Sequence, residues 1–122
     1  MDLNILNQQI GDVSVVALKG RIVLGEESSA LRERIKSLVG DGKKKIVLNM
    51  ANVTYIDSAG LGTLVAAHIS VKKQGTTLLL SDLGNKFHDV LQITRLLTVF
   101  SVYATEAEAI SSLEVTAKAA VA

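Results

Sequence analysis

The sequence contains no cysteine, which excludes a disulfide framework, thiol chemistry and any cysteine-based metal site. Its only aromatic residues are Tyr55, Phe87, Phe100 and Tyr103, too few to form a platform for stacking nucleic-acid bases. The formal net charge of +1 provides no long-range attraction to nucleic acid or to anionic lipid. We therefore expect no nucleic-acid partner, no metal and no cofactor.

Long apolar segments are also missing. The longest apolar region, residues 61–71, is interrupted by Gly62, Thr63, His68 and Ser70 and is shorter than the ~20 residues that a membrane-spanning helix needs. The first residues have neither the basic start nor the apolar core of a secretory signal. These features predict a cytoplasmic protein without direct membrane insertion.

The length of 122 residues fits a single domain built around one hydrophobic core. Hydrophobic residues make up 48% of the chain and charged residues 20%, which is typical of a globular domain. We expect one domain over residues 1–122, with an ordered core from about residue 3 to 113 and a frayed tail over 115–122.

The first half of the chain predicts a hairpin, a helix and a buried strand. Two strands, within residues 3–10 and 13–18, flank Gly11-Asp12 and predict an antiparallel hairpin. A helix follows the loop 20–24, with acidic residues at its start and glycines after its end. Residues 46–48 are apolar without interruption, as expected of a central strand covered by helices on both sides.

The second half predicts alternating helices and strands. A helix from Ser58 is closed by Gly75, a strand covers residues 76–80, and Asn85 caps a third helix. A last strand covers residues 97–102, and Thr105 and Glu108 have the capping-box spacing that opens a final helix. Because helical crossovers impose parallel pairing, we predict a single α/β domain: a mixed sheet with an N-terminal antiparallel hairpin, then parallel strands alternating with helices packed on the sheet.

The sequence around Ser58 carries the most information about function. Ser58 precedes apolar residues at helical spacing, which predicts that it is the N-cap of an amphipathic helix; these residues are Leu61, Leu64, Val65 and Ile69. A hydroxyl at this place lies beside the positive end of the helix dipole. Gly60 and Gly62 are poor helix formers, which indicates close backbone approach at the first turn. Spacing alone does not distinguish a simple cap from a functional serine.

The segment Asp57-Ser58-Ala59-Gly60-Leu61-Gly62 follows the run 45–50 and a predicted turn at 51–53. Together they resemble the signature of the STAS domain, and most closely that of the bacterial anti-sigma factor antagonists. The resemblance extends from about Leu3 to about Leu113. In that family a partner kinase phosphorylates the serine of the Asp-Ser-x-Gly-Leu motif, which implies Ser58 as the phosphorylation site here.

The resemblance also implies the partners. The unphosphorylated protein would bind an anti-sigma factor and so release a sigma factor. That anti-sigma factor would also be the serine kinase, with a histidine-kinase-like ATPase fold, and a metal-dependent serine phosphatase would reverse the step. The chain would then be substrate and ligand, with no catalytic residue. The partner-binding surface that we expect comprises Gly20, Arg21, Ile22, Val23, Leu24, Asp57, Ser58, Ala59, Gly60, Leu61 and Gly62.

Two departures from the family pattern concern this surface. Many antagonists have Gly-Glu-Leu-Asp in the first loop, whereas Arg21 and Val23 replace the two acidic residues here. The identity of the partner is therefore open. Ala59 stands where relatives carry Ser or Thr, which leaves Ser58 as the acceptor hydroxyl of the motif.

The sequence argues against two other functions and leaves one alternative open. Hydrolysis would need a base for Ser58, but His68 lies about 15 Å further along the same helix, and the Gly-x-Ser-x-Gly elbow is missing around Ser58. Phosphorylation on Asp57 would need a carboxylate cluster, and the first hairpin offers only Asp12. The main alternative is a STAS interaction subunit of a signalling assembly or of a lipid or anion transporter, in which Ser58 is never modified.

Overall fold

The computed structural model describes residues 1–95 and 99–121. In the described part of the chain the elements follow in the order β1 (Leu3–Ile10), β2 (Val13–Ile22), α1 (Glu26–Gly40), β3 (Lys45–Ile56), α2 (Ser58–Lys73), β4 (Thr77–Ser81), α3 (Asn85–Ile93), β5 (Ser101–Tyr103) and α4 (Glu106–Val121). The strands form one five-stranded sheet in the order β1-β2-β3-β4-β5. The pair β1/β2 is antiparallel and the other neighbours are parallel, which confirms the predicted fold class.

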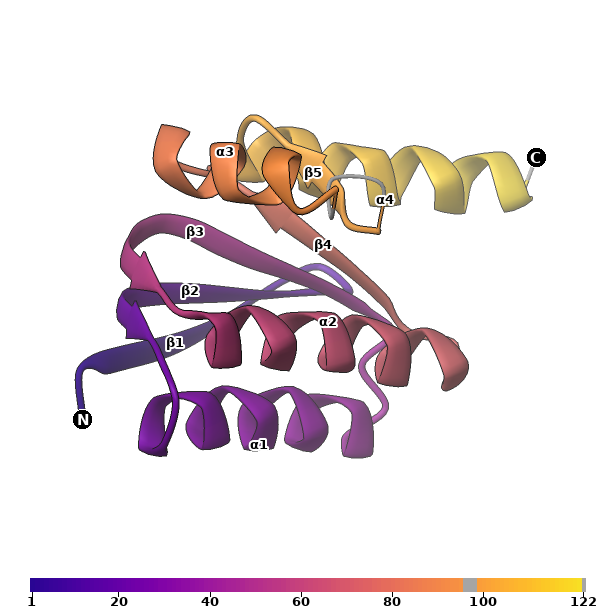
Figure 1. Ribbon diagram of the computed structural model, residues 1–122. Helices are drawn as coiled ribbons and strands as arrows, with labels where there is room; N and C mark the ends of the chain where they lie inside the picture. Colours follow the sequence, from indigo (N-terminus) through magenta and orange to yellow (C-terminus); the bar gives the residue numbers. More distant parts are fainter. Residues whose placement is uncertain (96–98, 122) are drawn as a thin grey trace.

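Helices cover both faces of the sheet (Figure 1): α1 and α2 lie side by side on one face, and α4 lies on the other. Successive side chains of β3 point to opposite faces, as the pleat requires. Ile46 and Leu48 belong to the larger core, which contains the buried residues of α1 and α2, whereas Val47 packs in the smaller core with Ala109 and Leu113 of α4. The prediction of a central strand covered on both sides is confirmed.

The strands that lead to the motif are longer than predicted. β2 continues to Ile22, so three residues of the expected loop 20–24 belong to a strand. β3 continues to Ile56, and the turn predicted at 51–53 is wrong. Backbone pairing with β2 holds this second half of β3 extended, at Gly20↔Val53 and Ile22↔Ile56, with two register shifts between the strands.

The helix ends agree with the sequence in most places. Gly75, at φ +78°, follows α2 and donates its N–H to the carbonyl of Lys72, as a helix-closing glycine does. The backbone N–H of Glu108 donates to Thr105 Oγ1 at 3.1 Å, as the capping box requires. The prediction for Asn85 is wrong, because Gly84 is the cap of α3 and Asn85 is its first residue.

The C-terminal part differs from the prediction in two ways. The last strand was expected over residues 97–102; β5 covers Ser101–Tyr103, and residues 97 and 98 lie outside the described residues. A frayed tail was expected from residue 115, whereas α4 continues to Val121. Within the described residues, no helix combines the length and the apolar character needed to cross a membrane.

The buried face of α2 differs from the one expected. Ile69 is 47% exposed, although it was predicted to face the core. The buried residues are Gly60, Thr63, Leu64, Ala67 and Val71, which are spaced as i, i+3, i+4, i+7 and i+11. Small residues therefore occupy much of the contact between α2 and the rest of the molecule, and the helix lies close to its neighbours.

Candidate functional site

The candidate site is formed where β2 and β3 end. These strands are parallel neighbours, and their last residues, Ile22 and Ile56, are paired. The segments that follow, residues 23–25 and 57–62, therefore emerge at the same edge of the sheet. This arrangement brings together two stretches that the sequence analysis assigned to one surface, although more than thirty residues separate them.

Asp57 joins the two segments. Its Oδ1 accepts a hydrogen bond from the backbone N–H of Gly60 at 2.7 Å, and its Oδ2 accepts one from the backbone N–H of Leu24 at 3.0 Å. Its own backbone N–H donates to the carbonyl of Ile22 at 3.2 Å. Asp57 therefore has a structural role, because it accepts hydrogen bonds from both the helix start and the opposite segment.

Asp57, not Ser58, is the N-cap of α2. The backbone of Asp57 is extended, its side chain accepts from the first turn, and Ser58 is the first helical residue. The prediction that Ser58 is the cap is therefore wrong by one position. A carboxylate is the stronger acceptor at this place because its charge interacts favourably with the helix dipole. The hydrogen bonds from Gly60 and Leu24 lower the pKa of the Asp57 carboxyl below its ordinary value, so Asp57 is ionised near neutral pH.

The two glycines of the motif have different surroundings. A Cβ on Gly60 would lie 2.0 Å from the backbone oxygen of Ile22, so only glycine fits between α2 and the end of β2. A Cβ on Gly62 would have no atom within 4 Å. The close backbone approach expected from the sequence is confirmed for Gly60, which lies against the backbone of Ile22. It is not found at Gly62.

Ser58 is exposed on the first turn of α2. Its hydroxyl makes no hydrogen bond within the described part of the chain. Its neighbours in sequence are the ionised Asp57 on one side and Ala59, which is half-buried, on the other. The side chain is thus accessible, has no bond to lose on modification, and lies beside a fixed negative charge.

Two residues of the expected binding surface are buried. Ile22 is fully buried in the larger core, and Gly60 is covered by the end of β2, so neither presents a side chain to a partner. Within the expected surface, these two residues are therefore covered by the rest of the chain. The other members are exposed or half-buried, with Leu24 at 77% exposure the most prominent; they are Gly20, Arg21, Val23, Leu24, Asp57, Ser58, Ala59, Leu61 and Gly62.

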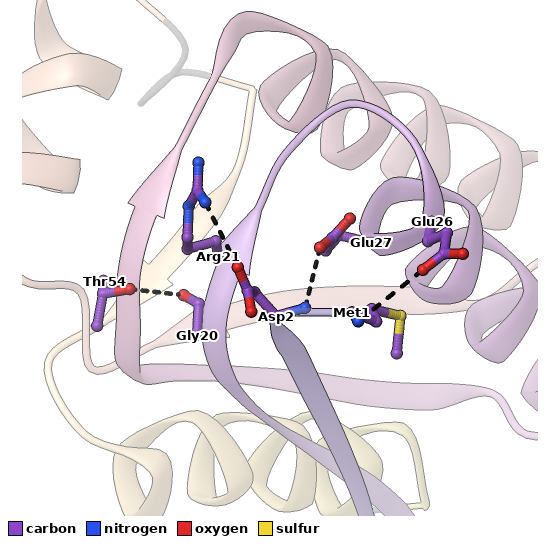
Figure 2. Close-up of polar contacts among 7 residues, drawn as sticks. All are labelled: Met1, Asp2, Gly20, Arg21, Glu26, Glu27 and Thr54. Carbon is purple, nitrogen blue, oxygen red and sulfur yellow. Dashed lines mark hydrogen bonds and ion pairs between the residues drawn. The ribbon is translucent and has the colours of Figure 1, made fainter.

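Arg21 is engaged by residues that the sequence analysis did not single out (Figure 2). Its Nη1 lies 3.4 Å from Asp2 Oδ2, and its guanidinium lies 5.6 Å from the centre of the Tyr55 ring. The backbone N–H of Asp2 donates in turn to Glu27 Oε2 at 2.9 Å. Gly20 allows this arrangement, since a Cβ there would meet the backbone oxygen of Asp2 at 1.9 Å. No local pattern in the sequence reports contacts between such distant residues.

His68 is the histidine of α2 and stands ten residues beyond Ser58. The ring of His68 lies against Phe100, with ring centres 5.4 Å apart, and so borders the core. Burial, and secondarily the charge of Lys72, lowers the pKa of His68. Within residues 1–95 and 99–121 no three His, Asp or Glu side chains are grouped so as to hold a metal ion.

Comparison with known proteins agrees with the fold and the motif. The family model of the STAS domain matches residues 4–109. The chain is 24% identical over 115 residues to the anti-sigma F factor antagonist of Paenibacillus polymyxa, which covers 94% of this chain and 98% of the relative. It is 30% identical over 105 residues to the anti-sigma-B factor antagonist of Bacillus subtilis (strain 168), covering 85% and 94% of the two chains. A crystal structure of an anti-sigma factor antagonist from Mycobacterium paratuberculosis has the same fold, with a TM-score of 0.79, 24% identity, and coverage of 92% and 94%.

The mixed five-stranded sheet is that of a STAS domain, and residues 20–24 and 57–62 form a surface at its edge, here called the loop–helix surface. The chain belongs to the STAS domain family. The named relatives are anti-sigma factor antagonists, and this chain spans nearly their whole length.

Proposed function

We propose that this protein is an anti-sigma factor antagonist whose binding is controlled by phosphorylation of Ser58. The unphosphorylated form binds an anti-sigma factor through the loop–helix surface, and a sigma factor is thereby released. The observation that carries the proposal is the state of Ser58: an exposed hydroxyl at the start of α2, beside the ionised Asp57, with no hydrogen bond to residues 1–95 or 99–121. The antagonist names of the two sequence relatives support the same role.

The partners follow from this role. The anti-sigma factor is also the serine kinase, with a histidine-kinase-like ATPase fold, and transfers the phosphoryl group from its bound ATP to Ser58 Oγ. A metal-dependent serine phosphatase hydrolyses the phosphoserine and restores the binding form. This chain supplies the acceptor hydroxyl and the docking surface, and the catalytic groups belong to the two partner enzymes.

The effect of the phosphate is electrostatic. It adds about −1.5 to −2 charges next to the Asp57 carboxylate, within a surface that would otherwise lose its water on docking. Asp57 already accepts the N–H of Gly60, so the phosphate has less of the helix start available than an uncapped helix would offer. The helix start therefore neutralises the added charge only in part, and like-charge repulsion and desolvation oppose docking of the partner. A loss of a few kcal/mol in binding free energy is enough for a switch, because each loss of about 1.4 kcal/mol lowers the affinity tenfold.

The fold is retained during this change. Ser58 has no hydrogen bond to the rest of the described chain, and the bonds that hold the site together run through Asp57 and Gly60. Modification of Ser58 Oγ breaks none of them. Binding is lost while the domain remains folded.

The experiment that tests the proposal is intact-mass analysis after incubation with the anti-sigma kinase of the same organism and ATP. We expect one added phosphate on the wild-type chain and none on Ser58→Ala. Ser101, an exposed serine on the edge strand β5, provides the control position, because Ser101→Ala should still be phosphorylated. If the kinase is active on another substrate but adds no phosphate to this chain, the alternative of an unmodified interaction subunit is favoured instead.

A further inference from the structure

A groove between α1 and α2 begins at the loop–helix surface, with which it shares Leu24, Ala59 and Gly62, and extends away from it. Its first part, about 430 Å³, lies between the starts of the two helices. Its second part, about 320 Å³, continues toward their ends. The two parts share three lining residues, Arg32, Thr63 and Ala66, and therefore form one continuous depression. Figure 1 shows the two helices, α1 and α2, lying side by side.

The groove has an apolar floor and a basic side. Ile35, Ala67 and Val71 line the floor and are buried beneath it. Every charged side chain among the lining residues is basic: these are Arg32 and Lys36, one turn apart on α1. Both are exposed, and neither makes an ion pair or a hydrogen bond within the described part of the chain. Two exposed cations beside an apolar floor are complementary to a ligand with an apolar face and an acidic edge.

The length of the groove identifies the kind of ligand. Its lining runs along α2 from Ala59 to Gln74, which corresponds to about 22 Å by helical rise. Small or uncharged residues of α2, including Gly62, Ala66 and Ser70, leave the groove open along this distance. An amphipathic helix of about four turns has the matching length and places its apolar residues along one face.

We propose that this groove docks an acidic amphipathic helix of the anti-sigma partner, adjacent to the surface that carries Ser58. This inference rests on the proposed function, since it assigns a second contact to the same partner. The apolar face of the helix covers Ile35, Ala67 and Val71, and its carboxylates pair with Arg32 and Lys36. The partner is thus held at two places, of which only the loop–helix surface contains the phosphorylation site.

The test is the dissociation constant of the anti-sigma kinase for a set of variants, measured by calorimetry in low and high salt. Arg32→Glu/Lys36→Glu reverses both cations of the groove, and Ala66→Gln places a longer side chain inside it. Lys19→Glu/Lys72→Glu is the matched control, because it makes the same charge change at exposed residues that do not line the groove. Melting temperatures verify that every variant is folded.

We expect both groove variants to weaken binding at least about tenfold, the control to stay within about twofold, and the loss to shrink at high salt for the charge variant. If either groove variant binds the kinase with the same affinity as the wild type, the proposed groove contact is overturned and the proposed function still stands. Absence of binding by the wild-type chain itself would overturn both. If the control variant weakens binding of the kinase as much as the groove variants do, the proposed groove contact is also overturned, because the affinity then responds only to net charge.

Discussion

The carboxylate of Asp57 accepts a hydrogen bond from the backbone N–H of Leu24 across 33 residues of sequence. The same side chain caps α2 through Gly60. One residue therefore fixes both the start of the helix that carries Ser58 and the loop that faces it. The geometry of the candidate surface depends on this aspartate more than on the serine.

Replacement of Asp57 should loosen the surface. Asp57→Asn keeps one carbonyl oxygen as an acceptor but presents an NH₂ group to one of the two backbone N–H donors, so it should be less stable than the wild type. Asp57→Ala loses both acceptors and should be less stable still. The midpoint of urea unfolding should decrease in the order wild type, Asp57→Asn, Asp57→Ala. Equal midpoints for all three would contradict the joining role of Asp57.

The stability of this contact should depend on pH in a defined direction. The pKa of Asp57 is lowered in the folded protein, so the folded state favours the ionised form more than the unfolded chain does. The contribution is fully present above the unfolded pKa, near 3.8, and is lost as pH falls below it toward the folded pKa. Acid unfolding of wild type and Asp57→Asn should therefore converge below about pH 4. A constant gap between the two curves down to pH 2 would exclude this linkage.

Gly60 and Gly62 form a matched pair for mutation. Gly60→Ala should destabilise the fold by about 1–3 kcal/mol, because the methyl group meets the backbone oxygen of Ile22. Gly62→Ala should stabilise it by about 0.5–1 kcal/mol, because alanine is the better helix former and the space is open. Chemical denaturation measures both. Effects of the same sign at the two positions would contradict the packing described here.

Ser58 should contribute little to stability. It is exposed and makes no hydrogen bond within the described residues, so Ser58→Ala should change the free energy of unfolding by less than about 0.5 kcal/mol. Thermal unfolding of the two proteins at the same pH gives the comparison. A larger loss would mean that the hydroxyl has a structural role, and the effect of phosphorylation could then include unfolding.

His68 should make the protein less stable as pH falls. Its pKa is lowered by burial and then by Lys72, so the folded state binds a proton less readily than the unfolded chain. For a base with a lowered folded pKa, stability is full above the unfolded pKa of about 6.5 and decreases as pH falls through it. His68→Leu should therefore lose part of the difference in stability between pH 8 and pH 5. A mutant with the full wild-type pH dependence would contradict this assignment.

The sequence predicted the order of the elements because local signals were strong there. Gly11-Asp12 between two alternating runs gave the hairpin, and Thr105 with Glu108 gave the start of α4. Ser58 was misplaced as the cap because Asp57 and Ser58 are both good capping residues and stand side by side, so that only the backbone geometry separates them.

Contacts between distant segments were not predictable in the same way. The continuation of β3 to Ile56 depends on pairing with β2, and the need for glycine at position 60 depends on Ile22. The exposure of Ile69 follows from the close packing of small residues on the other side of α2, which hydrophobic periodicity does not report. The pattern located the site, and the tertiary contacts determine which of its residues are accessible.

The measurement that tests the central claim most directly is the affinity of the anti-sigma kinase for the protein before and after stoichiometric phosphorylation at Ser58, with circular dichroism of both forms. We expect tight binding of the unmodified protein, at least about tenfold weaker binding of the phosphorylated protein, and identical spectra. Equal affinity of the two folded forms would contradict the switch.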